Sequence, residues 1–183
     1  RAAFDMMRTG LSRCSHLVSQ LLTLARNELG AAASQSEPVL LPQIAREVLI
    51  EQAMLAQARN IDLGLTGDDQ VRVRGDAEGL RAMIGNLVHN AIRHTPAHGK
   101  IDVSISAGDA GPLLEISDSG TGIPEPERQR VFDRFYRRAE SKDTGSGIGL
   151  AIVRSVALRH GASVTLHDAP SGPGLLVRVQ FPR

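Results

Sequence analysis

The chain has 183 residues, which suits one ordinary domain with an additional element and is too short for two full-sized domains. Its 21 basic and 20 acidic side chains give a formal net charge of +1, so no overall field attracts it to nucleic acid or to an anionic membrane. No apolar run is long enough to span a bilayer, and the single cysteine excludes an internal disulfide framework. Because the chain begins with Arg and shows no signal peptide, we expect a piece of a longer protein.

The first 30 residues have the pattern of one long helix. Apolar residues recur there at alternating steps of three and four, a period near 3.5 that predicts a bundle helix needing a partner. Gly30 and the small polar residues after it predict a helix end and a linker. We therefore expect a bundle helix at 1–30, a linker at 31–38 and a domain at 39–183. The apolar positions are Phe4, Met7, Leu11, Cys14, Val18, Leu21 and Ala25.

Residues 39–183 have a mixed pattern of helices and strands, with several strands joined as hairpins. This order predicts an α+β fold, a two-layer sandwich with helices on one face of a mixed sheet. Asp76 is expected to cap the most regular helix, which ends before Pro96. Helices are predicted at 43–59, 77–94, 126–135 and 147–160, and strands at 61–65, 71–74, 101–107, 113–117, 163–167 and 175–181.

The helix at 77–94 carries Asn86, Asn90 and Arg93 within about 40° of one another, opposite its apolar half. One interpretation is an ordinary solvated face. Asn is a poor choice for such a face, because mid-helix Asn lowers helix propensity relative to Glu, Lys or Gln. An amide oxygen is also a hard ligand suited to Mg²⁺. The stripe is therefore a candidate metal and phosphate site.

A turn with two glycines, Gly120 and Gly122, follows the strand at 113–117 and begins at Asp118. A carboxylate at a strand end can accept hydrogen bonds from an exocyclic amine, and glycines allow the backbone to approach a flat ring closely. A plain turn has the same sequence features, so this segment alone leaves both interpretations open.

A second glycine-rich segment, Gly145-Ser146-Gly147-Ile148-Gly149-Leu150, leads directly into an apolar helix. Backbone amides at the positive end of a helix favour phosphate. Leu150 replaces the third glycine of a dinucleotide fingerprint, and the Gly-Lys-Ser/Thr of a P-loop is missing. A flexible loop without a ligand is the alternative.

Between the two glycine segments lie Phe132, Phe135 and Tyr136, followed by Arg137 and a polar stretch to Thr144. We expect Phe132 and Phe135 to pack against the core and the polar stretch to form a mobile lid whose arginines reach phosphate. Acidic residues alternate with the arginines here, which argues against a nucleic-acid patch.

Taken in order, these segments resemble the nucleotide-binding motifs of bacterial sensor histidine kinases: the N box at 86–90, the G1 box at 118–122, the F box at 132–136 and the G2 box at 145–150. The resemblance implies a catalytic ATP-binding domain of the Bergerat (GHKL) fold at 39–183. Residues 1–30 resemble the second helix of the dimerisation and phosphotransfer hairpin. The run 16–26 is similar to the quorum- and tricarboxylate-sensing members.

The resemblance implies a role for each motif. Asn90, helped by Asn86, would coordinate Mg²⁺, Arg93 would contact phosphate, and His94 would stack on adenine. Asp118 would accept the adenine amine in a pocket shaped by its glycines, and the second glycine segment would form the lid hinge and phosphate turn. The complete implied ATP site comprises Asn86, Asn90, Arg93, His94, Asp118, Gly120, Gly122, Ile123, Phe132, Tyr136, Arg137, Gly145, Ser146, Gly147, Ile148, Gly149 and Leu150.

The resemblance also indicates what the site does with ATP. ATPases of the same superfamily have a Glu at the position of Asn86 that activates water, and an amide cannot act as that base. We therefore expect phosphate transfer to a His, then to an Asp in the receiver domain of a response regulator. The acceptor His is expected to be absent, because His16 precedes Leu17 rather than an acidic residue.

The implied parent is a homodimer formed through the helical hairpin and is embedded in a bacterial inner membrane, and this chain is part of its cytoplasmic portion. We expect no nucleic-acid partner and no direct membrane contact by this part. Two alternatives stay open: a GHKL serine kinase or ATPase, and a non-catalytic nucleotide-binding module that serves dimerisation.

Overall fold

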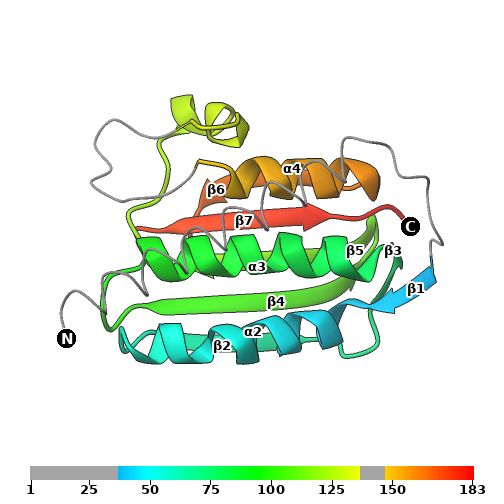
Figure 1. Cartoon of the computed structure of the whole chain (residues 1–183), viewed down its shortest axis with the longest axis horizontal. Helices are drawn as coiled ribbons and strands as arrows, with labels where there is room; N and C mark the ends of the chain where they lie inside the picture. The colour runs from blue at the N-terminus through cyan, green and yellow to red at the C-terminus, as the bar shows by residue number, and fades with distance from the viewer. Residues whose placement is uncertain (1–36, 137–146) are drawn as a thin grey trace, which may run out of the picture.

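The computed structural model describes residues 37–136 and 147–183, which contain three helices over a sheet (Figure 1). The five-stranded sheet has the order β2-β4-β5-β7-β6, in which β2 and β4 are parallel and the other neighbours are antiparallel. The strands β1 and β3 form a separate antiparallel pair. The elements are β1 (Glu37–Leu40), α2 (Leu41–Gln57), β2 (Asp62–Gly67), β3 (Arg72–Gly75), α3 (Ala77–His94), β4 (Lys100–Gly108), β5 (Gly111–Asp118), α4 (Gly149–Arg159), β6 (Ser163–Asp168) and β7 (Leu175–Gln180).

The three helices lie on the same face of the sheet, as Figure 1 shows, and the core fills the space between the two layers. On β4 the buried residues Ile101, Val103 and Ile105 alternate with partly exposed ones, which is the period of a half-buried strand. The predicted α+β arrangement, with helices on one face of a mixed sheet, is confirmed.

The predicted caps of α3 are also correct. The Asp76 side chain accepts a hydrogen bond from the Glu78 amide (3.1 Å), and the helix ends at His94, two residues before Pro96. The apolar half of this helix is fully buried, whereas Asn86 and Asn90 are partly exposed. The sequence pattern therefore placed both ends and the buried face of α3 correctly.

The predicted helix at 126–135 is wrong. The structure has two short 3-10 turns there, Glu125–Glu127 and Arg130–Phe132. Asp133 is extended (φ −74°, ψ 143°) and Phe135 adopts a positive φ of 62°, so the chain leaves the helical path after Phe132 and no α-helix spans 126–135. Similarly, α4 begins at Gly149 rather than at 147, because Gly147 has a φ of +69°.

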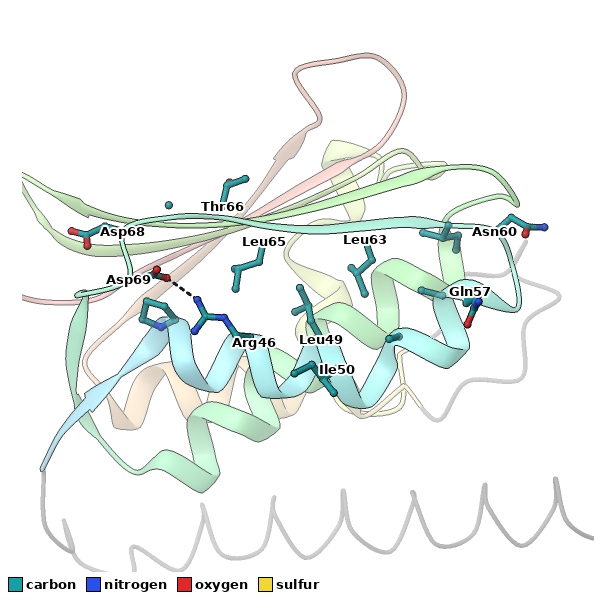
Figure 2. A pocket seen from close by; sticks show the side chains of 15 residues that line it. Arg46, Leu49, Ile50, Gln57, Asn60, Leu63, Leu65, Thr66, Asp68 and Asp69 are labelled. Atoms are coloured by element: carbon teal, nitrogen blue, oxygen red, sulfur yellow. Dashed lines mark hydrogen bonds and ion pairs between the residues drawn. The ribbon is translucent and has the colours of Figure 1, made fainter.

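A groove of about 750 Å³ runs between α2 and the edge strand β2, as Figure 2 shows. Leu63 and Leu65 point from β2 toward Leu49 of α2, and an ion pair between Arg46 and Asp69 (2.8 Å) closes one end. The residues lining this groove come from α2, β2 and the segments that flank them, so it is separate from the predicted nucleotide site.

The predicted bundle helix at 1–30 and most of the predicted linker, through residue 36, lie outside the described residues. The last two predicted linker residues, Glu37 and Pro38, belong instead to β1 and pair with β3. Within the described part, no helix has the length and apolar content needed to cross a membrane.

Candidate nucleotide-binding site

The amides of α3 lie against the first residue of α4. The Nδ2 atom of Asn86 donates to the Ala82 carbonyl (2.8 Å), which fixes the orientation of the amide. A methyl group added at Gly149 would lie 3.1 Å from Asn86 Oδ1 and 3.5 Å from Asn90 Nδ2. Residues about 60 positions apart in sequence thus form one small polar recess, which a side chain at Gly149 would fill.

The last turn of α3 connects this recess to the G1 turn. Arg93 is partly buried, and its carbonyl accepts a hydrogen bond from the Arg59 guanidinium (2.9 Å). His94 has an exposed side chain, and a methyl group at Gly120 would lie only 2.7 Å from the His94 carbonyl oxygen. Gly120 is therefore required for the close approach of the G1 turn to the end of α3.

Asp118 is the last residue of β5 and points into the core layer. It has the same parity along β5 as the buried residues Leu114 and Ile116, and only 7% of it is exposed. Its Oδ1 atom accepts hydrogen bonds from the amides of Gly120 (2.8 Å) and Leu175 (3.3 Å). Burial raises the pKa of the Asp118 carboxyl, although these two backbone hydrogen bonds oppose that shift.

The G1 turn leaves β5 through a tight bend that an arginine supports. Gly122 has a φ of +68°, a left-handed conformation that favours glycine, and Ile123 is partly buried. The Arg128 guanidinium donates to the Ile123 carbonyl through Nε (2.9 Å) and forms an ion pair with Asp168. A cavity of about 330 Å³ lies between this turn and the loop joining β6 to β7.

The F box divides its aromatic residues between the core and the surface. Phe132 is buried, at 8% exposure, whereas Phe135 is 65% exposed. The prediction that both pack against the core is therefore wrong for Phe135, because its positive φ turns the chain away from the helical path. Tyr136 is partly buried, and the Arg130 guanidinium lies 4.8 Å from the centre of its ring.

The backbone of the F box is tied to the G2 box. The Phe135 amide donates to the Gly147 carbonyl (2.9 Å), and a methyl group at Gly147 would lie 2.8 Å from the Phe135 carbonyl carbon. Ile148 is buried, and Leu150 is partly buried against the core. Arg137, Gly145 and Ser146, which the sequence also assigns to the site, lie outside the described residues.

The sequence reasoning missed the residues that support Asp118 from β7. A methyl group at Gly174 would lie 1.9 Å from the Asp118 carbonyl oxygen, and Gly174 has a φ of +153°. This glycine precedes Leu175, whose amide bonds the carboxylate. The only sequence signal was the run Ser171-Gly172-Pro173-Gly174, which reads as an ordinary turn between two strands.

The described residues contain no cluster of three His, Cys, Asp or Glu side chains that could hold a metal ion. The recess at Asn86, Asn90 and Gly149 instead offers amide groups at the start of a helix. Such a site suits a hard cation that takes most of its ligands from water and phosphate. The arrangement thus has a buried carboxylate at the end of β5 and an amide recess between α3 and α4.

Comparison with known proteins identifies the family. Residues 75–183 match the model of the histidine kinase-, DNA gyrase B- and HSP90-like ATPases. The chain belongs to this family. The mycobacterial sensor histidine kinase MprB has a solved structure that superposes with a TM-score of 0.71 at 34% identity, over 80% of this chain and 97% of that one. The catalytic domain of histidine kinase ThkA gives a TM-score of 0.72 at 25% identity, over 80% and 96% of the two chains.

Longer relatives agree with this assignment. The chain is 39% identical over 174 residues to the sensor protein kinase PmrB of Pseudomonas aeruginosa, covering 94% of this chain and 36% of that protein. It is 36% identical over 177 residues to the signal transduction histidine-protein kinase/phosphatase MprB of Mycobacterium bovis, covering 94% and 34%. The chain spans about a third of the length of these curated relatives. It contains the ATP-binding catalytic domain of a sensor histidine kinase.

Proposed function

We propose that this kinase domain binds ATP together with Mg²⁺ between α3, α4 and the G1 turn. The observation that carries the proposal is the recess in which Gly149 faces the amides of Asn86 and Asn90. Asp118 would bind the other end of the nucleotide. Its Oδ1 is engaged by two backbone amides, so Oδ2 is the atom that would accept a hydrogen bond from the adenine amine.

Mg²⁺ fits this site, with Asn90 as the principal protein ligand and Asn86 beside it. Bound there, the ion would bridge and neutralise phosphate oxygens of ATP. Arg93, in the last turn of α3, would contact phosphate, and His94 would cover the adenine ring. The backbone of Gly147, Ile148 and Gly149 would form the phosphate turn, and Leu150 would pack behind it.

Several of these residues act by holding the others in place. Gly120 and Gly122 keep the G1 turn close to the end of α3 and to β7, and Ile123 is held through its carbonyl by Arg128. Phe132 anchors the F box in the core. Tyr136 and Arg137, together with Gly145 and Ser146, would border the bound phosphates.

The reaction we propose is transfer of the γ-phosphate of ATP to a His nitrogen, rather than hydrolysis. Asn86 stands where a hydrolytic enzyme of this superfamily needs a carboxylate base, and an amide cannot take a proton from water at neutral pH. The phosphate would then pass to an Asp in the receiver domain of a response regulator. The acceptor His would lie on the first hairpin helix of the parent, outside these 183 residues.

We further propose the organisation of the parent. Residues 1–30 are the second helix of the dimerisation and phosphotransfer hairpin, and a linker joins them to the catalytic domain, which begins with β1 at Glu37. The hairpin makes the parent a homodimer, and the parent lies in the inner membrane with this portion in the cytoplasm. The run 16–26 supports membership of the quorum- and tricarboxylate-sensing subfamily. Within the stretch directly upstream in the reading frame, a helix with a His followed by an acidic residue, itself preceded by a transmembrane segment, would support this organisation.

Radiolabelled ATP tests the transfer proposal directly. The purified 183-residue chain should bind ATP in the presence of Mg²⁺ and acquire no acid-labile phosphate by itself. Addition of the helical hairpin of the parent should then produce labelled hairpin, whereas steady release of ADP without labelled protein would indicate an ATPase instead. Acid-labile labelling of the isolated chain would contradict the assignment of the acceptor to a missing helix.

A further inference from the structure

His160 joins the two helices that carry the amide recess, at the end farthest from that recess. α3 and α4 run antiparallel, so the C-terminus of α4 lies beside the N-terminus of α3 (Figure 1). The Asp76 amide, at the N-cap of α3, donates to His160 Nε2 (3.0 Å). The other ring nitrogen, Nδ1, lies 2.8 Å from the Val156 carbonyl of α4.

The two partners determine the tautomer of the ring. A carbonyl oxygen can only accept and a backbone amide can only donate, so Nδ1 carries the hydrogen and Nε2 accepts. The neutral ring therefore makes one bond within its own helix and one bond to the start of the neighbouring helix. Of these two bonds of the ring, the one to the Asp76 amide connects α4 with the start of α3.

Gly75 leaves room for this ring. A methyl group at Gly75 would lie 2.1 Å from His160 Cδ2, whereas one at Gly79 would make an ordinary contact with Cε1 at 3.6 Å. The Asp76 carboxylate caps α3 by accepting from the Glu78 amide and lies 3.9 Å from the Arg159 guanidinium. The ring is thus packed on the backbone of Gly75 at the joint between β3, α3 and α4.

The opposite end of the same helix pair holds Asn86 and Asn90 against Gly149, with only 3.1 Å between Asn86 Oδ1 and the position of a methyl group at Gly149. A small axial shift of α4 along α3 would close or open this recess. Packed helices can undergo small sliding movements, whereas a directional hydrogen bond at one end restricts them.

We infer that His160 is a positioning residue for ATP binding: its hydrogen bond to the Asp76 amide sets the axial position of α4 relative to α3, and hence the shape of the recess at Asn86, Asn90 and Gly149. This inference rests on the proposed function. His160 lies far from the nucleotide, so its substitution should lower ATP affinity although no contact with ATP is lost. Apparent affinity falls in proportion to the fraction of molecules with the competent helix position.

Two substitutions separate the two bonds of the ring. His160→Asn can replace the donor to Val156 but does not reach Asp76, whereas His160→Gln can present an acceptor to the Asp76 amide. Isothermal titration with ATP and Mg²⁺ should show about fivefold weaker binding for His160→Asn, and binding within about twofold of the unsubstituted chain for His160→Gln. Because Gly75 does not have a positive φ, Gly75→Ala acts through the ring alone and should weaken binding about as much as His160→Asn.

The double variant and a destabilised control complete the test. His160→Asn combined with Gly75→Ala should bind no more weakly than either single variant, because both break the same bond. Leu63→Ala, which removes packing between β2 and α2, should lower the melting temperature and leave ATP affinity unchanged. If His160→Asn fails to fold, Gly75→Ala and His160→Gln still give the comparison.

Three outcomes would overturn the inference: normal affinity in folded His160→Asn or Gly75→Ala, equal losses in the Asn and Gln variants, or an equal loss in Leu63→Ala. Failure of the unsubstituted chain to bind ATP would instead refute the proposed function, and the inference with it. Normal binding by every variant would refute the inference alone.

Discussion

Replacing Asp118 with Asn should abolish ATP binding and, at neutral pH, stabilise the empty domain. The substitution keeps the shape of the side chain, and the Asn oxygen can still accept from the amides of Gly120 and Leu175. The atom that faces the adenine amine changes from a charged acceptor into a donor. Binding and stability should therefore move in opposite directions.

The structure gives the size of the binding effect. A hydrogen bond to a charged group contributes about 1.5–3 kcal/mol, and a buried donor left without an acceptor costs about 1–3 kcal/mol. Together these give a loss of about 2.5–6 kcal/mol, or between about 60-fold and 20,000-fold in the dissociation constant. Isothermal titration with ATP and Mg²⁺ measures this loss. The matched control is Asp109→Asn, an exposed carboxylate in the turn between β4 and β5.

The stability effect follows from the raised pKa of Asp118. Burial makes this carboxyl harder to ionise in the folded chain than in the unfolded chain, so its contribution to stability is complete below the unfolded pKa and is lost as pH rises through the folded pKa. At pH 7 the Asn variant should melt at a higher temperature than the unsubstituted chain. Each 1 kcal/mol that removal of the buried charge adds to the free energy of unfolding raises the melting temperature by about 2–4 °C. The difference should disappear below about pH 4.

Two results would refute this reasoning. The first is ATP affinity within about tenfold of the unsubstituted chain, which would show that Asp118 does not face the adenine amine. The second is an Asn variant that melts at a lower temperature at pH 7, which would show that the buried carboxylate stabilises the empty fold. Thermal melts from pH 4 to pH 8 supply the second measurement.

Two further predictions concern the recess between α3 and α4. Asn90→Ala should bind ATP weakly, and its affinity should be the same with and without EDTA. The unsubstituted chain should lose at least about tenfold in ATP affinity when EDTA removes Mg²⁺. If the affinity of the variant still depends on Mg²⁺, Asn90 is not the principal ligand. Gly149→Ala should lower ATP affinity about tenfold, because its methyl group would lie 3.1 Å from Asn86 Oδ1. Its melting temperature should be nearly unchanged, because Gly149 is the first residue of α4 and not in the middle of the helix, where glycine is destabilising; a lower melting temperature with unchanged affinity would contradict this view of the recess.

The parts of the fold that depend on local sequence were predictable. Asp76 and Pro96 mark the two ends of α3. The 3.6-residue period distinguishes the buried half of this helix from the stripe with Asn86 and Asn90. The two-residue period of β5 likewise implies that Asp118 faces inward, because Leu114 and Ile116 do. Each of these statements needs only neighbouring residues, so one sequence suffices to make it.

Contacts between distant segments were not predictable in the same way. Nothing local to Gly174 indicates that it lies against the Asp118 carbonyl, because Asp118 ends β5, Gly174 directly precedes β7, and the two meet only when these strands pair. The helix predicted around Phe132 and Phe135 was wrong for another reason. The aromatic spacing suits a helix, but the chain is extended at Asp133 and has a positive φ at Phe135, so only two short 3-10 turns form.

The two ends of the proposed site rest on different kinds of support. Asp118 ends a central strand whose position is fixed by backbone hydrogen bonds to β4 and β7. The amide recess instead lies between two helices, whose relative axial position depends on side-chain packing and on the His160 joint. Substitutions at the end of β5 should therefore abolish nucleotide binding, whereas substitutions along the α3–α4 pair should reduce the affinity only in part. A kinase domain built this way can change its affinity for the phosphates through small helix movements while adenine recognition stays constant.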